Sequence, residues 1–68
     1  MRNPNRTYEF CNEFAKIWSE RLPDWRFGQL MGNFMSWCIN TKKRDPFFPE
    51  ETEMIELFKE FCGVKEGE

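Results

Sequence analysis

The chain has 68 residues, of which 40% are hydrophobic and 18% aromatic, and its formal net charge is -2. This length limits it to one small domain, and the aromatic content excludes intrinsic disorder. A near-neutral charge and the lack of a long apolar run argue against general nucleic-acid affinity and a membrane span. No apolar leader follows the first methionine, so we expect a cytoplasmic protein.

The residue types that usually perform catalysis or bind metals are scarce. There is no histidine, which removes the commonest general base and metal ligand. Cys11, Cys38 and Cys62 are too widely spaced for a zinc motif, and we expect buried free thiols that behave as small hydrophobic residues. Phosphate-binding glycine loops and nucleophile elbows are also missing. We therefore expect a non-enzymatic protein with no catalytic residue, cofactor or metal.

The first segment with helical periodicity predicts a helix over about residues 4–22. Asn3 is a suitable N-cap, and Pro4 suits the first helical position because its missing N–H would be unpaired there. Pro23 disfavours the α conformation in the residue before it, so the helix should end near Leu22. Its apolar face consists of Phe10, Cys11, Phe14, Ala15, Ile17, Trp18 and Leu22.

A second helix is predicted over about residues 26–40. With Arg26 as the N-cap, Gln29 can reach back to the cap, and Trp25 and Leu30 occupy the two positions of a hydrophobic staple. Apolar residues cover more than half of the helix circumference. That distribution predicts a central helix that is contacted on two sides.

One edge of this second helix carries small residues at every fourth position: Gly28, Gly32 and Ser36. Two glycines inside a helix cost about 1 kcal/mol each relative to alanine, so we expect the close approach of another helix to offset them. We expect this chain to supply that helix. The alternative is a second copy, which would make the three residues a self-association edge and the protein a homodimer rather than a monomer.

The connection to the third helix contains a basic run, Lys42 to Arg44, followed by Asp-Pro-Phe-Phe-Pro. Two prolines bracket Phe47 and Phe48, which makes this stretch stiffer than an ordinary loop. One interpretation is that the rings tuck under the helices as a lid on the core. The other is that at least one ring is presented to a partner, as aromatic anchors are at interfaces.

A third helix is predicted over about residues 50–62. Gly63 suits the position after its end, with Val64 placed for the accompanying hydrophobic contact, and residues 65–68 should fray. Its inner face consists of Met54, Ile55, Leu57, Phe58, Phe61 and Cys62. The sequence therefore predicts an all-α protein, a compact three-helix bundle that forms one domain over residues 1–68.

Charge is divided unevenly along the chain. Residues 1–44 carry eight Lys/Arg and four Asp/Glu, whereas residues 45–68 carry eight Asp/Glu and two Lys. The outer glutamates of the third helix, which only Lys59 opposes, either keep the protein soluble or dock on a protein partner with a basic surface. The candidate partner-binding residues are Phe47, Phe48, Glu50, Glu53, Glu56 and Glu60.

Nucleic-acid binding is a weaker alternative. The basic run from Lys42 to Arg44 is shorter than most nucleic-acid patches. The turn at residues 23–25 suits a helix-turn-helix DNA-binding protein, but the helix that follows is too apolar to offer a recognition face.

The segment from Leu22 to Leu30 (LPDWRFGQL), followed by DPFF from Asp45, resembles a family of small uncharacterised proteins of bacteria and their phages. The family signature is P-D-x-R-F-G-Q-L and then D-P-F-[FY]. This chain has Trp25 where the family commonly has an aliphatic residue, and Pro49 where the motif usually continues without a proline. The resemblance implies a bacterial, prophage or phage source and a cytoplasmic setting. We expect a non-enzymatic protein-interaction module, and a specific form of it is an inhibitor of a bacterial defence or host machine, for example a CRISPR nuclease, that binds through the acidic helix face.

Overall fold

The computed structural model describes residues 2–65, which form three helices and no strand. The helices are α1 (Asn5–Arg21), α2 (Phe27–Asn40) and α3 (Glu51–Phe61). Each boundary lies within one residue of its predicted position, and the predicted all-α three-helix fold is confirmed. Residues 66–68 of the predicted frayed tail lie outside the described residues.

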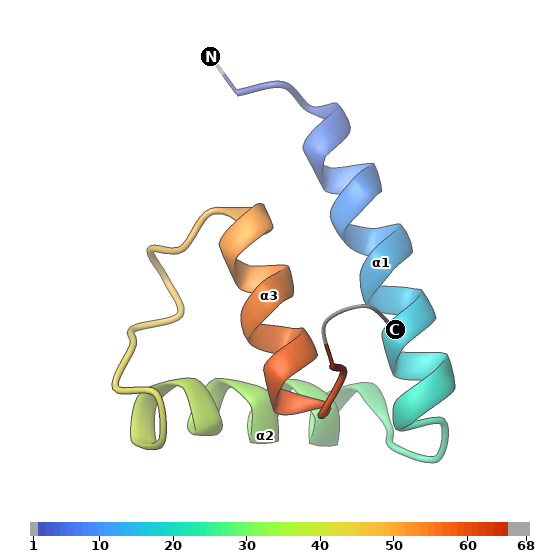
Figure 1. Cartoon of the computed structure of the whole chain (residues 1–68), viewed down its shortest axis with the longest axis vertical. Helices are drawn as coiled ribbons and strands as arrows, with labels where there is room; N and C mark the ends of the chain where they lie inside the picture. Colours follow the sequence, from blue (N-terminus) through green and yellow to red (C-terminus); the bar gives the residue numbers. More distant parts are fainter. Residues whose placement is uncertain (1, 66–68) are drawn as a thin grey trace.

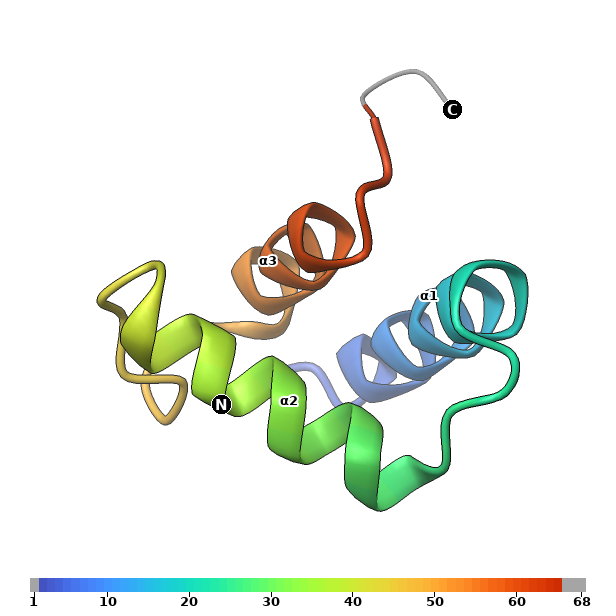
Figure 2. The ribbon, with the colours of Figure 1, turned by 90° about the horizontal axis from the view of Figure 1, so that it is seen from below.

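The three helices form two layers (Figure 1). Helices α1 and α3 run side by side in the same direction, and α2 crosses below their C-terminal ends. The view from below shows α2 spanning both of them (Figure 2). Helix α3 is the one that packs against both others. The prediction that the second helix is central is therefore wrong, because α2 buries one face only, through Leu30, Phe34 and Cys38.

The start of α1 is fixed by Asn3, as predicted. Pro4 already has helical backbone angles (φ -64°, ψ -17°). The side-chain Oδ1 of Asn3 accepts a hydrogen bond from the backbone N–H of Asn5 at 3.0 Å, which satisfies one of the unpaired donors of the first turn. The hydroxyl of Thr7 donates to the Pro4 carbonyl at 2.8 Å.

Two further predicted helix ends are confirmed. At the start of α2, the backbone N–H of Arg26 donates to Oε1 of Gln29 at 2.9 Å. At the end of α3, Gly63 takes a left-handed conformation with φ +74°, and the N–H of Val64 donates to the Lys59 carbonyl at 2.8 Å. This bond across the last turn satisfies a helix-terminal carbonyl that would otherwise be unpaired.

Helix α3 is central because its Phe58 packs against aromatic rings of both other helices. The Phe58 ring is fully buried and lies 4.6 Å from the Phe14 ring of α1 and 5.1 Å from the Phe34 ring of α2, centroid to centroid. Such ring pairs add about 0.5–1.5 kcal/mol to the stabilisation from burial. The buried core consists of Ile17, Leu30, Phe34, Cys38, Leu57 and Phe58.

The cysteines do not all share the environment predicted for them. Cys38 is buried and Cys62 is half-buried, and burial raises the pKa of both thiols. Cys11 is exposed on α1, so the prediction of a buried thiol is wrong there. Ala15, one turn further along the same side of α1, is exposed as well, so the neighbouring helices leave this side of the predicted apolar face uncovered.

Candidate partner-binding surface

The connection between α2 and α3, residues 41–50, is called the aromatic loop here because it carries Phe47 and Phe48. These side chains are 84% and 75% exposed. The lid interpretation is therefore wrong, since neither ring covers the core. The aromatic loop leaves α2 at one end of the molecule and arches back to the start of α3 (Figure 1).

Local interactions hold the two rings in place. Oδ1 of Asp45 accepts a hydrogen bond from the backbone N–H of Phe47 at 3.0 Å, which mimics a backbone turn. The rings of Phe47 and Phe48 contact each other edge to face, with centroids 5.1 Å apart and planes at 74°. Pro46 and Pro49 restrict the backbone on either side. The exposed rings are thus presented on a pre-organised turn, and pre-organisation of this kind reduces the entropy that a binding loop loses.

An open hollow of about 450 Å³ lies between the end of α2 and the aromatic loop, lined by Ile39, Lys43, Arg44 and Asp45. Ile39 is 52% exposed and supplies its apolar part. Asp45 lines this hollow, and its side chain also accepts the hydrogen bond from the backbone N–H of Phe47. Lys43 has φ +58°. Residues other than glycine, asparagine and aspartate rarely adopt this left-handed backbone conformation.

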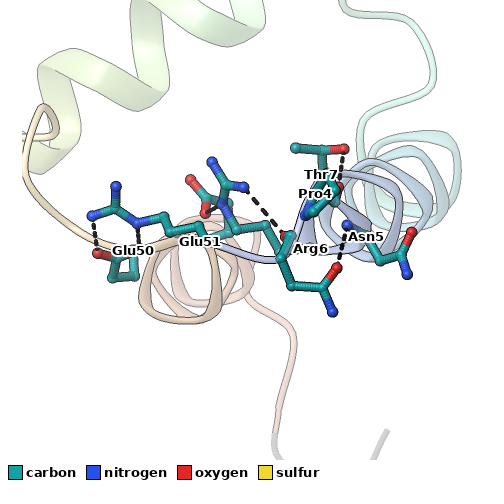
Figure 3. Close-up of polar contacts among 8 residues, drawn as sticks. Pro4, Asn5, Arg6, Thr7, Glu50 and Glu51 are labelled. Carbon is teal, nitrogen blue, oxygen red and sulfur yellow. Dashed lines mark hydrogen bonds and ion pairs between the residues drawn. The ribbon is translucent and has the colours of Figure 1, made fainter.

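The predicted acidic surface is largely neutralised by the chain itself. Glu50 binds Arg2, with Arg2 Nη2 and Glu50 Oε1 2.6 Å apart. This hydrogen bond from the guanidinium lowers the pKa of Glu50. Arg6 of α1 reaches Glu51 at the start of α3, with Nε and Oε1 2.6 Å apart (Figure 3).

The remaining glutamates of the predicted surface also have partners. Arg44 of the aromatic loop binds Glu53, and Lys42 binds Glu60, with Nζ and Oε1 2.8 Å apart. Glu56 lies 3.3 Å from Lys59 within α3. The prediction that only Lys59 opposes these glutamates is wrong, because the fold brings the basic half of the chain onto the acidic helix.

The small-residue edge of α2 faces outward. A Cβ atom added at Gly28 or Gly32 would have no neighbour within 4 Å outside the helix's own nearby backbone, and both glycines and Ser36 are exposed. The expectation that another helix of this chain approaches this edge is wrong. Self-association through it stays a prediction.

A second open groove, of about 540 Å³, lies between α1 and α3. Its lining is mostly charged and of both signs, including Glu13, Lys16 and Glu20 from α1 and Glu56 and Lys59 from α3. No charged side chain among residues 2–65 is buried, and burial is what usually raises the pKa of a catalytic carboxylate. The charged side chains that line this groove are therefore all at least partly exposed to solvent.

Within the described part of the chain, no three His, Cys, Asp or Glu side chains lie close enough together to hold a metal ion. None of the three helices has both the length and the apolarity that crossing a membrane requires. Comparisons of the chain with family models, with curated proteins and with solved structures found no match. The resemblance to the phage and bacterial family therefore stays a prediction.

The sequence pointed to Phe47 and Phe48 but not to two residues that line the hollow at the end of α2, Ile39 and Lys43. Ile39 is one of the apolar residues of the helix predicted over residues 26–40, and Lys43 belongs to the basic run from Lys42 to Arg44. Ile39 follows the buried Phe34 by five residues, which at 3.6 residues per turn places it about 140° around the helix and away from the core. No local pattern indicated that Lys43 diverges from the two basic residues beside it.

Proposed function

We propose that this protein is a non-enzymatic protein-interaction module whose contact surface is the aromatic loop. The observation that supports the proposal is the exposure of Phe47 and Phe48 on a turn fixed by Asp45 and two prolines. Fully burying a phenylalanine side chain is worth about 1.5–3 kcal/mol. Because both rings stay exposed after folding, this free energy is still available, and burial of the rings by a partner would favour binding by about that amount for each ring.

The acidic face of α3 has a smaller part in this proposal. A partner with a basic surface would have to compete with Arg2, Lys42 and Arg44 for the glutamates. An inhibitor of a bacterial defence or host machine, such as a CRISPR nuclease, is one form that such a module could take. Its support is the small size of the protein and the family resemblance.

The DNA-binding alternative has less support. Helix α2 would be the recognition helix, and it contains no lysine or arginine with which to contact phosphates. We therefore place the proposed function in protein recognition.

The test is site-specific photo-crosslinking in cells that naturally make the protein. A photoreactive phenylalanine analogue replaces Phe47 in one variant and Tyr8 in a control, because Tyr8 is 70% exposed on α1, outside the aromatic loop. We expect one discrete crosslinked protein from position 47 that is missing from position 8. Equal or absent crosslinking at both positions would contradict the proposal.

A further inference from the structure

The part of the aromatic loop that carries the two exposed rings, residues 45–49, is anchored at its ends to different helices. Before it, the N–H of Arg44 donates to the Cys38 carbonyl of α2 at 2.9 Å. After it, the Glu50 carbonyl accepts the N–H of Met54 in the first turn of α3, at 2.8 Å. Among residues 2–65, the segment 45–49 forms no hydrogen bond or ion pair outside its own turn. The position of the rings therefore depends on how α3 lies against the end of α2.

Two ion pairs join the end of α2 to α3. Lys42 binds Glu60, with Nζ and Oε1 2.8 Å apart, and Arg44 binds Glu53. The two glutamates are seven residues apart in α3, a distance of about 10 Å along the helix axis. Attachment at two points this far apart restricts rotation of α3 relative to the loop as well as sliding.

The backbone between these two attachments is strained. Lys43 has φ +58°, an unfavourable conformation for a residue with a Cβ atom. Such conformations persist only where the surrounding structure imposes them. Here Lys42 and Arg44 are both tied to α3 through their side chains, and the N–H of Arg44 is tied to α2. The strain indicates that this end of the aromatic loop is held in one arrangement.

We propose that Arg44 and Glu53 are positioning residues whose ion pair holds the aromatic loop in the arrangement that the partner binds. This inference rests on the proposed function and assigns Glu53 a different part in it. The sequence predicted that Glu53 contacts the partner directly, whereas here it acts through Arg44.

The strength of one ion pair suits this role. An exposed pair adds little to the stability of a whole domain, and both of these side chains are close to half exposed. Local displacement of a loop can cost almost no free energy. A small contribution therefore decides where the rings lie without deciding whether the chain folds, and a loop that is already in place loses less entropy when it binds.

The test is a charge swap that is followed by NMR relaxation of the isotope-labelled protein. Arg44→Glu and Glu53→Arg each bring like charges together, and the double variant restores the pair with its charges exchanged. We expect backbone N–H order parameters of about 0.85 at Phe47 and Phe48 in the wild type and the double variant, and values below about 0.6 in each single variant. The urea midpoint should stay nearly the same in all four proteins, which separates positioning from folding.

Glu56→Arg is the matched control. It makes the same change in charge as Glu53→Arg, one turn further along α3, where Glu56 pairs with Lys59 of the same helix. It should leave the order parameters of Phe47 and Phe48 unchanged. An equal loss of order in the control would show that the net charge of α3 matters and not the pair, and would overturn the inference.

Photo-crosslinking from position 47 connects the order of the loop to binding. Each single variant should lower the yield of crosslinked partner by up to about fivefold, the equivalent of one exposed ion pair, and the double variant should restore it. Restored order without a restored yield would mean that the partner contacts Glu53 or Arg44 directly, which would overturn the inference. So would order parameters that the single variants leave unchanged or that the swap does not restore.

Failure of the proposed function looks different. If the wild type captures no partner from position 47, the proposed function falls, while the order parameters still decide whether the ion pair positions the rings. If the wild type captures a partner and the order parameters ignore the charges, only the positioning inference fails.

Discussion

At the scale of single residues, the glycines differ in what a side chain would meet. Gly32 lies inside α2 with open space at its Cβ position, whereas Gly63 ends α3 with φ +74°. An added methyl group at Gly32 therefore causes no clash and lowers the backbone entropy of the unfolded chain. At Gly63 the same methyl group is strained by the backbone itself.

We predict opposite effects of alanine at these two positions. Gly32→Ala should raise the free energy of unfolding by about 1 kcal/mol, the difference in helix propensity. Gly63→Ala should lower it by about 1–2 kcal/mol, the cost of a left-handed conformation. Urea unfolding of both variants measures this. A destabilising Gly32→Ala would show that this edge is covered in solution.

The three cysteines allow a second prediction at this scale. Native protein treated with iodoacetamide should be alkylated first at Cys11, which is exposed, while Cys38 should react only on unfolding. Burial raises the pKa of the Cys38 thiol, so the reactive thiolate is disfavoured as well as inaccessible. Peptide mass spectrometry over time gives the order. Early modification of Cys38 would contradict the buried position described for it.

At the scale of helices and loops, the sequence predicted the ends of the elements well because capping is local. Asn3, Gln29 and Gly63 each act on backbone groups within a few residues. The sequence could not predict which helix is central. Periodicity shows that α2 is apolar around much of its circumference, but it does not show which neighbour covers each side.

The candidate surface was predictable only in part for the same reason. The prolines around Phe47 and Phe48 marked a stiff aromatic segment, yet its exposure depends on where α3 packs. The ion pairs that neutralise Glu50 and Glu60 join residues 48 and 18 positions apart. No local pattern specifies pairs of that separation.

The ion pair at the start of α3 gives a prediction of pH dependence. Because the pKa of Glu50 is lowered in the folded state, its contribution to stability is present above its unfolded pKa of about 4.3 and is lost as pH falls through the folded value. Glu50→Gln should therefore lose less stability between pH 7 and pH 3 than the wild type does. Urea midpoints at both pH values measure the difference, and an equal loss in both proteins would contradict the assignment.

At the scale of the whole molecule, the charges are distributed unevenly over the helices. Arg2 and Arg6 pair with Glu50 and Glu51 at the start of α3, and Lys42 and Arg44 of the aromatic loop pair with Glu60 and Glu53 within it. Helix α2 carries no charged residue over its 14 positions, although 32% of the chain is charged. The aromatic loop lies between these two regions and connects the uncharged helix to the acidic one.

The central claim is that Phe47 and Phe48 serve binding and not folding. The most direct measurement is the free energy of unfolding, in urea, of a Phe47→Ser/Phe48→Ser double variant beside Phe58→Ala. We predict that the double variant changes it by less than about 0.5 kcal/mol per site, because both rings face solvent, whereas Phe58→Ala loses about 3–5 kcal/mol. A loss of several kcal/mol in the double variant would show that the rings belong to the core and would contradict the account.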